Sequence, residues 1–291
     1  MINGIINVYK EKGFTSFDVV AKMRGMFHQK KIGHTGTLDP DAEGVLPVCL
    51  GKATKVCDLL TDKDKEYKAV LLLGVETDTQ DISGEILNQK EVDVSEDMVR
   101  EAILSFVGEY EQVPPMYSAL KVNGQKLCDL ARKGITVERK SRKVTIHHIE
   151  ILSMNLPEVE IIVSCSKGTY IRTLCDDIGK KLGCFGCMKS LLRTKVDRFE
   201  LEELLQQPES EWSFVEPIDC VFETYAAVTA TEAAQKLVDN GNRISESLIA
   251  DFSKEKMQEK VRLYDANSRF IGIYSYINES KEYKPIKMFM E

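Results

Sequence analysis

The sequence predicts an α+β protein whose core is a mixed, largely antiparallel β-sheet flanked by helices. Two segments in which apolar and polar residues alternate, 144–151 and 159–165, indicate a pair of neighbouring strands. The segment 66–74 is short and apolar and ends at a glycine, which is typical of a buried strand. Between such segments, apolar residues recur every three or four positions and predict helices that cover the sheet.

The other elements are predicted from the same two periodicities and from capping residues. Ser16 and Ser95 are each expected to cap a helix, because a serine hydroxyl can accept a hydrogen bond from the first helical turn. A later helix is expected to end at Gly183, a residue that favours the left-handed conformation of a helix end. In chain order the prediction is strand 4–10, a helix with Phe17, Val20, Met23 and Phe27 on its inner face, strand 45–50, helix 52–60, strand 66–74, a helix with Val99, Ile103 and Phe106 inside, a short helix 125–132, strands 144–151 and 159–165, a helix with Ile171, Leu174, Ile178 and Leu182 on one face, and a hairpin of 261–265 with 269–274.

The stretch 33–44 is predicted to be a shaped loop. Glycines at its start, middle and end, together with Pro40, interrupt any regular helix or strand. Asp39 lies in the middle of this loop, and Pro40 biases its backbone toward an extended conformation. An Asp-Pro pair often does no more than start a turn. Here the glycines also let other main chain approach, so the loop can present the Asp39 carboxylate to a ligand.

The residues of this loop and of the strand after it resemble a known catalytic motif. They read Gly-His-Thr-Gly-Thr-Leu-Asp-Pro at 33–40 and Gly-Val-Leu-Pro-Val-Cys-Leu-Gly-Lys-Ala-Thr-Lys at 44–55, an order that closely resembles the catalytic motif of the TruB-type tRNA pseudouridine-55 synthase family. The resemblance covers most of residues 4–200. It implies the sheet core of a pseudouridine synthase, with Asp39 at the family's catalytic aspartate and His34 at the histidine that meets the RNA.

Further segments carry the resemblance and extend the candidate site. They imply that Tyr67 is the active-site tyrosine that packs against the target base, and that Asp81 in Thr-Asp-Thr-Gln-Asp lies at the RNA-binding surface. The motif Gly-Thr-Tyr-Ile-Arg at 168–172 implies that Arg172 lies beside the catalytic aspartate and that Tyr170 lies near the substrate.

Position and resemblance give further expectations for two basic residues. Arg172 is predicted in the first turn of its helix, where a positive charge opposes the helix dipole and favours an anionic partner. A charge pair with Asp39 is expected to lower the pKa of that carboxyl by about 1–3 units and to keep it ionised. The resemblance also implies that Lys10 binds RNA, although Tyr9 and Glu11 differ from the family's usual Asp-Lys-Pro.

The chain is predicted to contain two domains. Residues 1–225 are expected to form the catalytic domain, and residues 114–143 within it resemble the family's thumb, an insertion that closes over the RNA stem-loop. Residues 201–291 contain 10 lysines and arginines against 17 acidic residues, and within them the β-rich residues 226–291 stand where the family has a small carboxy-terminal RNA-binding, PUA-like module. The stretch 208–217 resembles a connector between the two.

Composition limits the classes to which the protein can belong. The chain has 291 residues, of which 43% are hydrophobic, enough to build a substantial core. No uninterrupted apolar run approaches the roughly 18 residues of a membrane helix, so we expect no membrane partner and a cytoplasmic location. We also expect a monomer. The net charge is −7, but residues 121–200 contain 16 lysines and arginines against 9 acidic residues. The middle of the chain is therefore expected to meet a polyanion, which the resemblance identifies as the T stem-loop of tRNA.

The sequence gives no reason to expect a metal ion or a small-molecule cofactor. Its eight cysteines lie mostly in apolar segments, which is typical of reduced, buried thiols. Cys184 and Cys187 form a lone C-x-x-C without the second pair that a zinc site needs. Gly51-Lys52 fails the pattern of a phosphate-binding loop, which requires serine or threonine where this chain has Ala53.

These observations predict an isomerase that converts a T-loop uridine of tRNA to pseudouridine after the base is flipped out. The reaction needs a nucleophile, a pocket for the freed base and access to a stacked base, but no redox step. Attack by Asp39 on the base and attack on the sugar both stay open. Two other classes of protein also stay open. One is a retaining glycosidase, which would use Asp41 or Glu43 as a second carboxylate about 5 Å from Asp39. The other is an RNA chaperone, an activity that can coexist with catalysis.

Overall fold

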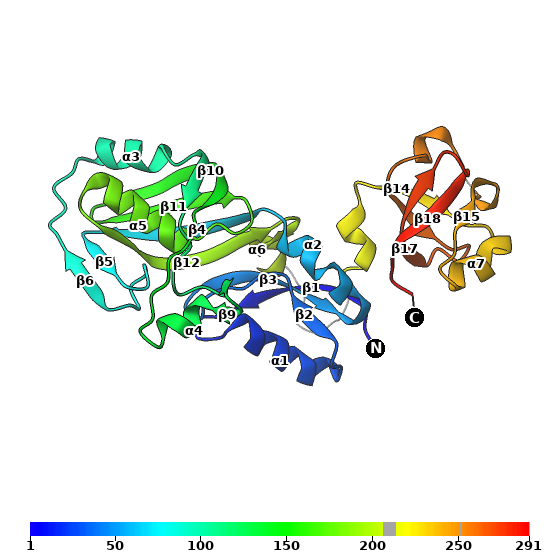
Figure 1. Cartoon of the computed structure of the whole chain (residues 1–291), viewed down its shortest axis with the longest axis horizontal. Helices are drawn as coiled ribbons and strands as arrows, with labels where there is room; N and C mark the ends of the chain where they lie inside the picture. Colours follow the sequence, from blue (N-terminus) through cyan, green and yellow to red (C-terminus); the bar gives the residue numbers. More distant parts are fainter. Residues whose placement is uncertain (206–213, 251, 291) are drawn as a thin grey trace.

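A nine-stranded sheet forms the larger part of the molecule, and a five-stranded sheet forms a smaller part at the carboxyl end (Figure 1). The computed structural model describes residues 1–205, 214–250 and 252–290. In their order across the large sheet, the strands are β1 (Gly4–Lys10), β3 (Glu43–Leu50), β12 (Gly186–Val196), β4 (Lys65–Leu73), β11 (Glu158–Cys165), β10 (Arg142–Asn155) and β7 (Gly108–Gln112), with β2 (Ile32–His34) beside β3 and β13 (Phe199–Glu200) beside β12. Neighbours run antiparallel except β3 and β12, so the predicted α+β fold with a largely antiparallel sheet is confirmed.

Strand β4 illustrates how the alternating pattern builds the core. Buried and half-buried residues alternate along it, so Ala69 and Leu71 face the same side of the sheet. Helices α3 (Glu96–Leu104) and α5 (Ile171–Leu182) contribute side chains to the same hydrophobic cluster. As predicted, the side chain of Ser95 caps α3 by accepting a hydrogen bond from its first turn.

The cap of helix α1 (Ser16–Phe27) differs from the prediction. The hydroxyl of Thr15, not that of Ser16, accepts a hydrogen bond from the backbone N–H of Asp18, whose carboxylate accepts one from the N–H of Thr15 in return. Ser16 is buried, and its hydroxyl accepts a hydrogen bond from the N–H of Leu38 at 2.9 Å. The predicted capping serine therefore ties the helix to the loop that carries the candidate catalytic acid.

The inner face of α1 also differs from the prediction at one position. Val19, Val20 and Met23 pack against β1, β2 and β3, whereas Phe17 is 61% exposed. Phe17 is exposed because a helix turns about 100° per residue, which carries it off the face that these three residues define. On the other side of these strands, the predicted helical segment 52–60 is formed by two short helices, η1 (Gly51–Val56) and α2 (Cys57–Thr61).

The two halves of the large sheet meet between β3 and β12. Their parallel pairing is confined to Glu43 and Gly44 opposite Leu192 and Arg193. Gly44 has a φ of +107°, and a β-carbon there would lie 2.2 Å from the backbone oxygen of Arg193. Only glycine allows the strands to approach this closely, and the loop 33–44 enters the sheet at this junction.

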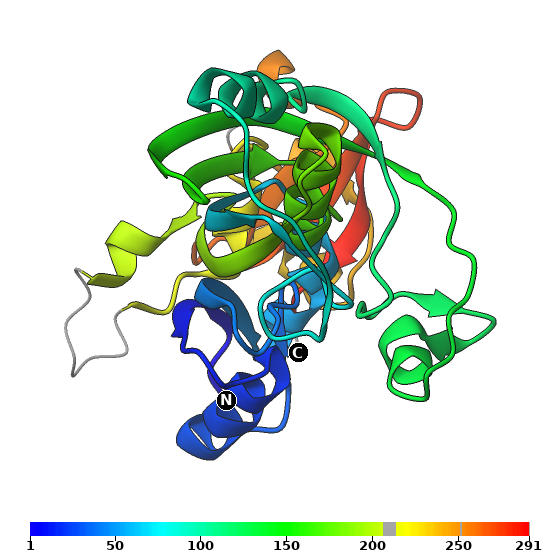
Figure 2. The same cartoon turned by 90° about the vertical axis from the view of Figure 1, so that its left-hand side faces the viewer.

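The predicted thumb, residues 114–143, projects from the sheet between β7 and β10 (Figure 2). Its helix is shorter than the predicted segment 125–132, because Gln125 and Lys126 belong to a small hairpin. A second segment that leaves the sheet contains the loop 77–85 and lies on the same side of the molecule. The elements of the two segments are β8 (Lys121–Val122), β9 (Gln125–Lys126), α4 (Leu127–Ala131), β5 (Val75–Thr77) and β6 (Ile86–Gln89).

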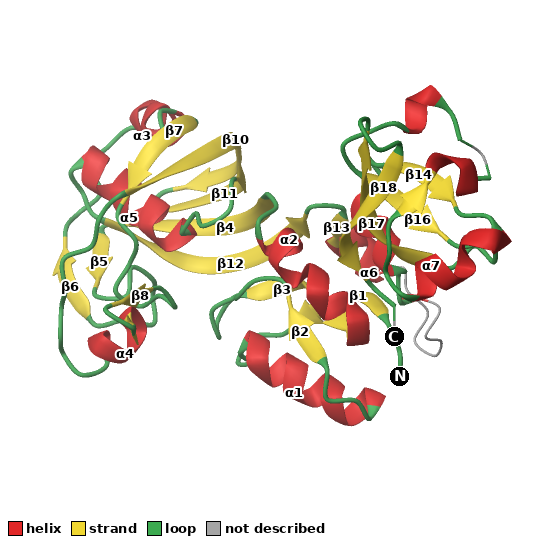
Figure 3. Cartoon of the chain, turned by 45° about the vertical axis from the view of Figure 1, so that its right-hand side comes forward, coloured by secondary structure: helices red, strands yellow, loops and turns green. Residues whose placement is uncertain are grey.

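The small sheet at the carboxyl end lies beside the large part (Figure 3). Aromatic residues belong to the hydrophobic cluster that joins the two. The ring of Phe222 contacts those of Phe270 and Phe289, and the Lys55 ammonium donates a hydrogen bond to the carbonyl of Met288 at 2.8 Å. The predicted hairpin is confirmed, because β16 and β17 pair antiparallel. Helix α6 (Leu201–Leu205) still lies against the large sheet, beside β1, β12 and β13. The elements that follow it are η3 (Ile218–Phe222), β14 (Ala226–Thr229), η4 (Glu232–Ala234), α7 (Gln235–Asp239), β15 (Ile244–Ser245), η5 (Glu246–Leu248), η6 (Lys254–Lys256), β16 (Val261–Tyr264), β17 (Phe270–Ile277) and β18 (Glu282–Met288).

The connector predicted at 208–217 lies partly outside the described residues, which resume at residue 214. Glu216, near its end, exchanges two backbone hydrogen bonds of 2.8 Å with Ile5 of β1. Among the residues that the structure describes, no helix combines the length and the apolar character needed to cross a bilayer.

Candidate active site

A pocket of about 340 Å³ opens at the junction of the two half-sheets. The loop 33–44, strands β4 and β12, the start of α5 and the first residues of the thumb all contribute to its wall. Its volume is within the range of small-ligand sites. The predicted site residues that line it are Asp39, Tyr67, Tyr170 and Arg172. The fold therefore brings together side chains that are far apart in the sequence.

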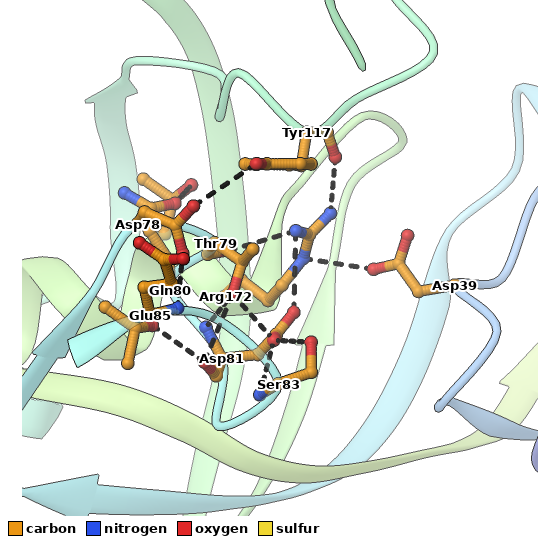
Figure 4. A network of polar contacts seen from close by, with 11 residues as sticks. Asp39, Asp78, Thr79, Gln80, Asp81, Ser83, Glu85, Tyr117 and Arg172 are labelled. Atoms are coloured by element: carbon orange, nitrogen blue, oxygen red, sulfur yellow. Dashed lines mark hydrogen bonds and ion pairs between the residues drawn. The ribbon is translucent and has the colours of Figure 1, made fainter. Parts of the chain in front are cut away.

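The carboxylate of Asp39 and the guanidinium of Arg172 form an ion pair, with 3.0 Å between Oδ2 and Nε. The side chain of Arg172 is 6% exposed, whereas that of Asp39 is 41% exposed. The guanidinium also donates hydrogen bonds to the backbone carbonyls of Thr79, at 3.0 Å, and Tyr117, at 2.7 Å. Figure 4 shows these contacts around the guanidinium, with Asp39 on the side away from the loop of Thr79. Backbone acceptors thus fix Arg172, and Arg172 orients Asp39.

Burial is the main influence on the pKa of Asp39, and it raises this pKa above its ordinary value. The positive charge of Arg172 lowers the pKa, and the negative charge of Asp81 raises it further. The expected effect of Arg172, a lower pKa for Asp39, is confirmed in direction, but burial outweighs it and the net shift of this pKa is upward. Asp39 is a stronger base than an ordinary carboxylate, and Arg172 favours its ionised form.

Asp81 lies against Arg172, and its surroundings differ from the RNA-binding surface that the resemblance implied. Its Oδ2 is 3.6 Å from Nη1 of Arg172, and its side chain is 17% exposed. Its Oδ1 accepts hydrogen bonds from the Thr79 hydroxyl at 2.8 Å and from the N–H of Ser83 at 3.0 Å. With its oxygens turned to protein groups, Asp81 supports the arginine (Figure 4).

Gln80 fastens the loop 77–85 to helix α5. Its backbone is in the left-handed region with a φ of +64°. Its side-chain amide donates to Asp176 at 2.7 Å and accepts a hydrogen bond from the Thr173 hydroxyl at 2.7 Å. These bonds hold the Thr79 carbonyl against Arg172. Sequence reasoning missed Gln80, because glutamine gives no local signal for a left-handed backbone.

Lys10 is buried beneath the Asp39 loop, which corrects the expectation that it binds RNA. The residue is 0% exposed, and its ammonium donates to the carbonyls of Glu11 at 3.0 Å, Pro40 at 3.2 Å and Ala42 at 2.6 Å. Burial lowers the pKa of Lys10, and nearby carboxylates oppose this effect. Its ammonium is therefore directed at the backbone on the carboxyl side of Asp39, where it holds the loop in shape.

Two tyrosines contribute aromatic surface to the pocket. Tyr67 on β4 is 9% exposed, and Tyr170 directly precedes α5. The side-chain amide of Gln112 fixes Tyr170, because it accepts from the Tyr170 N–H at 2.8 Å and donates to the Tyr170 carbonyl at 3.0 Å. Burial raises the pKa of both tyrosines, so their hydroxyls stay protonated near neutral pH. Gln112, which is 1% exposed, is another residue that the sequence did not reveal.

His34 lies outside this pocket, at a neighbouring hollow of about 530 Å³. Its Nδ1 accepts a hydrogen bond from the N–H of Gly36 at 3.3 Å. Burial lowers the pKa of His34, so the imidazole is mostly neutral at pH 7. Arg24, Lys30 and Lys31 border the same hollow, so His34 stands between this basic surface and the pocket that Gly36 helps to line.

Two buried cations, Lys65 and Arg193, also line the pocket and were not predicted. The Lys65 ammonium donates to the carbonyl of Thr61 at 2.6 Å, and burial together with the charge of Arg193 lowers the pKa of Lys65 to about 8. Both residues belong to strands, and their burial depends on how the two halves of the large sheet meet. The residues next to them in the sequence therefore did not predict that they are buried. Within the described part of the chain, no group of three or more His, Cys, Asp or Glu residues is arranged to hold a metal ion.

Two family models match adjacent parts of the chain, and both matches lie within residues 1–225. Residues 24–171 match the family described as TruB family pseudouridylate synthase (N terminal domain), and residues 172–209 match the tRNA pseudouridylate synthase B C-terminal domain. A protein of Lachnoclostridium phytofermentans named tRNA pseudouridine synthase B is 53% identical, over 99% of this chain and 100% of that relative. One of the same name from Alkaliphilus oremlandii is 48% identical, over 99% of this chain and 97% of the relative.

Solved structures resemble the chain over nearly its whole length. The protein in a crystal structure of a Cbf5-Nop10-Gar1 complex is 27% identical, with a TM-score of 0.70 over 99% of this chain and 85% of that one. The protein in a structure of an H/ACA RNP bound to a substrate RNA containing 2′-deoxyuridine is 25% identical, with a TM-score of 0.69 and the same coverage.

Proposed function

Because the chain belongs to the TruB family of pseudouridylate synthases, we propose that it isomerises uridine 55 in the T-loop of tRNA, with Asp39 as the nucleophile. The chain is an isomerase by its family, and the relatives named tRNA pseudouridine synthase B support tRNA as its substrate. The observation that carries the proposal is the 3.0 Å ion pair between Asp39 and Arg172 in a pocket that Tyr67 also lines.

The reaction breaks the bond between N1 of uracil and C1′ of ribose, turns the base, and joins its C5 to the same carbon. Asp39 supplies the nucleophile that this exchange needs. Arg172 favours the ionised carboxylate against the effect of burial, and it holds one carboxylate oxygen so that the other can reach the substrate. Attack on the base and attack on the sugar both fit this role.

The pocket offers compensation for moving the base out of the RNA stack. Unstacking costs a few kcal/mol, and stacking a base on an aromatic ring returns about 1–3 kcal/mol. We propose that the rings of Tyr67 and Tyr170 flank the flipped uracil. His34, mostly neutral and outside the pocket, would contact the RNA and hold the opened loop apart.

We propose that residues 1–225 are the catalytic domain, that residues 114–143 close over the T stem-loop as a thumb, and that residues 226–291 are a PUA-like module. One contact supports the role of the thumb. The carbonyl of Tyr117 accepts a 2.7 Å hydrogen bond from Arg172, so movement of this segment would reach the charge pair directly.

A second activity, assistance in tRNA folding, is proposed on the same grounds. The pocket can receive a uridine only after the T-loop has opened, so binding alone remodels the RNA. A variant without its nucleophile should therefore still help misfolded tRNA to fold. Equal folding rates with and without that variant would refute the second activity and leave the first untouched.

The test is to map pseudouridine in bulk tRNA after incubation with the purified chain. We expect new pseudouridine at position 55, together with an equal amount of tritium released from 5-tritiated uridine. Modification confined to other positions would refute the proposed target. Free uracil without pseudouridine would indicate a glycosidase, and unmodified tRNA would leave only the chaperone.

A further inference from the structure

The side chain of Arg193 is a buried cation whose bonds within the chain are incomplete. The residue is 1% exposed, and its Nε donates to the carbonyl of Val45 at 2.7 Å. Its Nη2 is buried and has no hydrogen-bond partner among the described residues. No carboxylate in the described part of the chain pairs with it. An unsatisfied N–H on a buried charge is costly, so the fold retains a donor that a bound molecule can use.

Arg193 borders the same pocket as the Asp39–Arg172 pair. Its Nη1 lies 3.6 Å from where a β-carbon would stand at Gly36, and its guanidinium interacts with the hydroxyl of Tyr67. The close approach of Gly44 to its backbone pins the residue at the junction of the half-sheets. Arg193 is therefore held rigidly beside the space where a base would lie.

The other cations of the pocket are already engaged. Arg172 contacts Asp39, Asp81 and two backbone carbonyls, and the Lys65 ammonium donates to backbone carbonyls. A purely structural role for Arg193, tying β12 to β3, accounts for the bond from Nε to Val45 but leaves Nη2 unexplained.

The chemistry of the proposed reaction calls for a cation at this place. When the bond from N1 to C1′ breaks, its electron pair moves onto the uracil, and the carbonyl oxygens O2 and O4 share the negative charge. The ring then forms its bond from C5 to C1′, and the Asp39 carboxylate is released from the carbon that it attacked. The hydrogen on C5 leaves as a proton to water, and N1 takes up a proton, so the product is neutral pseudouridine. A fixed donor in a water-poor site stabilises such transient charge most effectively.

We propose that the guanidinium of Arg193 binds a carbonyl oxygen of the flipped uracil through Nη2 and stabilises the anion formed when the base leaves the sugar. This inference rests on the proposed function, and it holds for either point of attack by Asp39. Arg193 is then a catalytic residue in its own right, separate from the charge pair.

The first test compares Arg193→Gln and Arg193→Lys in single-turnover tritium release from T stem-loop RNA with enzyme in excess. Removal of one donor to a developing anion costs about 10²–10³-fold in rate, so Arg193→Gln should lose that much while its affinity for tRNA stays within a few-fold. Arg193→Lys, which keeps the charge, should recover part of the loss. The matched control is Arg198→Gln, which removes a half-exposed arginine paired with Glu216 and Glu223 and should keep the wild-type rate.

The outcomes separate this inference from the proposed function. If wild type and Arg198→Gln release tritium and Arg193→Gln matches them, the inference fails and the function stands. If Arg193→Gln and Arg193→Lys are equally slow and both unfold at lower temperature, Arg193 is only structural. If the wild type itself releases no tritium, both the proposed function and this inference are refuted.

A second test does not depend on how well a variant at position 193 folds. Barbiturate has the shape of uracil and is anionic at neutral pH, so it mimics the departing base. Calorimetric titration of the double variant Asp39→Asn/Arg172→Gln, which removes both charges of the ion pair and keeps Arg193, should give at least about tenfold tighter binding for barbiturate than for uracil. Equal affinities would overturn the inference.

Discussion

Replacement of Arg172 by glutamine is expected to move the acid limb of the pH–rate profile to higher pH. The reacting form of Asp39 is the carboxylate, so the rate falls as the pH drops through the pKa of Asp39. Burial raises this pKa and Arg172 is the largest influence that lowers it, so without Arg172 only the smaller effect of Lys10 opposes burial. A cation within about 4–6 Å depresses a carboxyl pKa by about 1–3 units, and Nε of Arg172 is 3.0 Å away. The acid limb should therefore shift to higher pH by about 1–3 units.

The assay is single-turnover tritium release from T stem-loop RNA, measured over a pH series with enzyme in excess. Between the two pKa values the deficit of Arg172→Gln should grow about tenfold per pH unit as the solution becomes more acidic. The control is Arg269→Gln, which removes an arginine paired with Asp239 and Asp265 in the small sheet region and should leave the limb in place. A limb that stays in place or falls in Arg172→Gln would refute the assignment.

Three further outcomes are expected. Gly44→Ala should lower the unfolding temperature far more than Gly13→Ala. Both glycines have a positive φ, +107° and +87°, but only at Gly44 would the new β-carbon collide with backbone, at 2.2 Å. Equal decreases in unfolding temperature would contradict this. Lys10→Met should destabilise the fold by at least about 2 kcal/mol in denaturant titrations, since it strips a charged donor from buried carbonyls. The same variant should keep the salt slope of tRNA binding, and a smaller slope would mean that Lys10 reaches phosphate. Proteolysis within 114–143 should slow when tRNA is added, and an unchanged rate would count against closure of the thumb.

The parts of the site that could be predicted are those whose position follows from local chain geometry. The glycines and the proline around Asp39 required a loop, and the structure has one at the junction of the half-sheets. Arg172 at the start of a helix needed anionic partners, and it faces Asp39 and Asp81. The short apolar run of 66–74, ended by a glycine, placed Tyr67 on a strand, and its side chain lies on the buried face.

The parts that could not be predicted depend on burial created by distant segments. Lys10 lies at the end of a strand, as predicted. Its ammonium becomes a buried donor only because the Asp39 loop folds over it. The net upward shift of the Asp39 pKa was not predicted, because it comes from desolvation by surrounding segments, which charge counting does not include. Arg193 lies in a stretch for which the sequence predicted no element, and its unsatisfied Nη2 exists only where β12 meets β3.

The most direct test of the central claim is the single-turnover rate of Asp39→Asn, with Asp41→Asn, an exposed position of the same loop, as its control. The account predicts no tritium release from Asp39→Asn, with an affinity for tRNA close to that of the wild type, and a nearly normal rate for Asp41→Asn. Turnover by Asp39→Asn at a rate near that of the wild type would contradict the claim that this carboxylate performs the reaction.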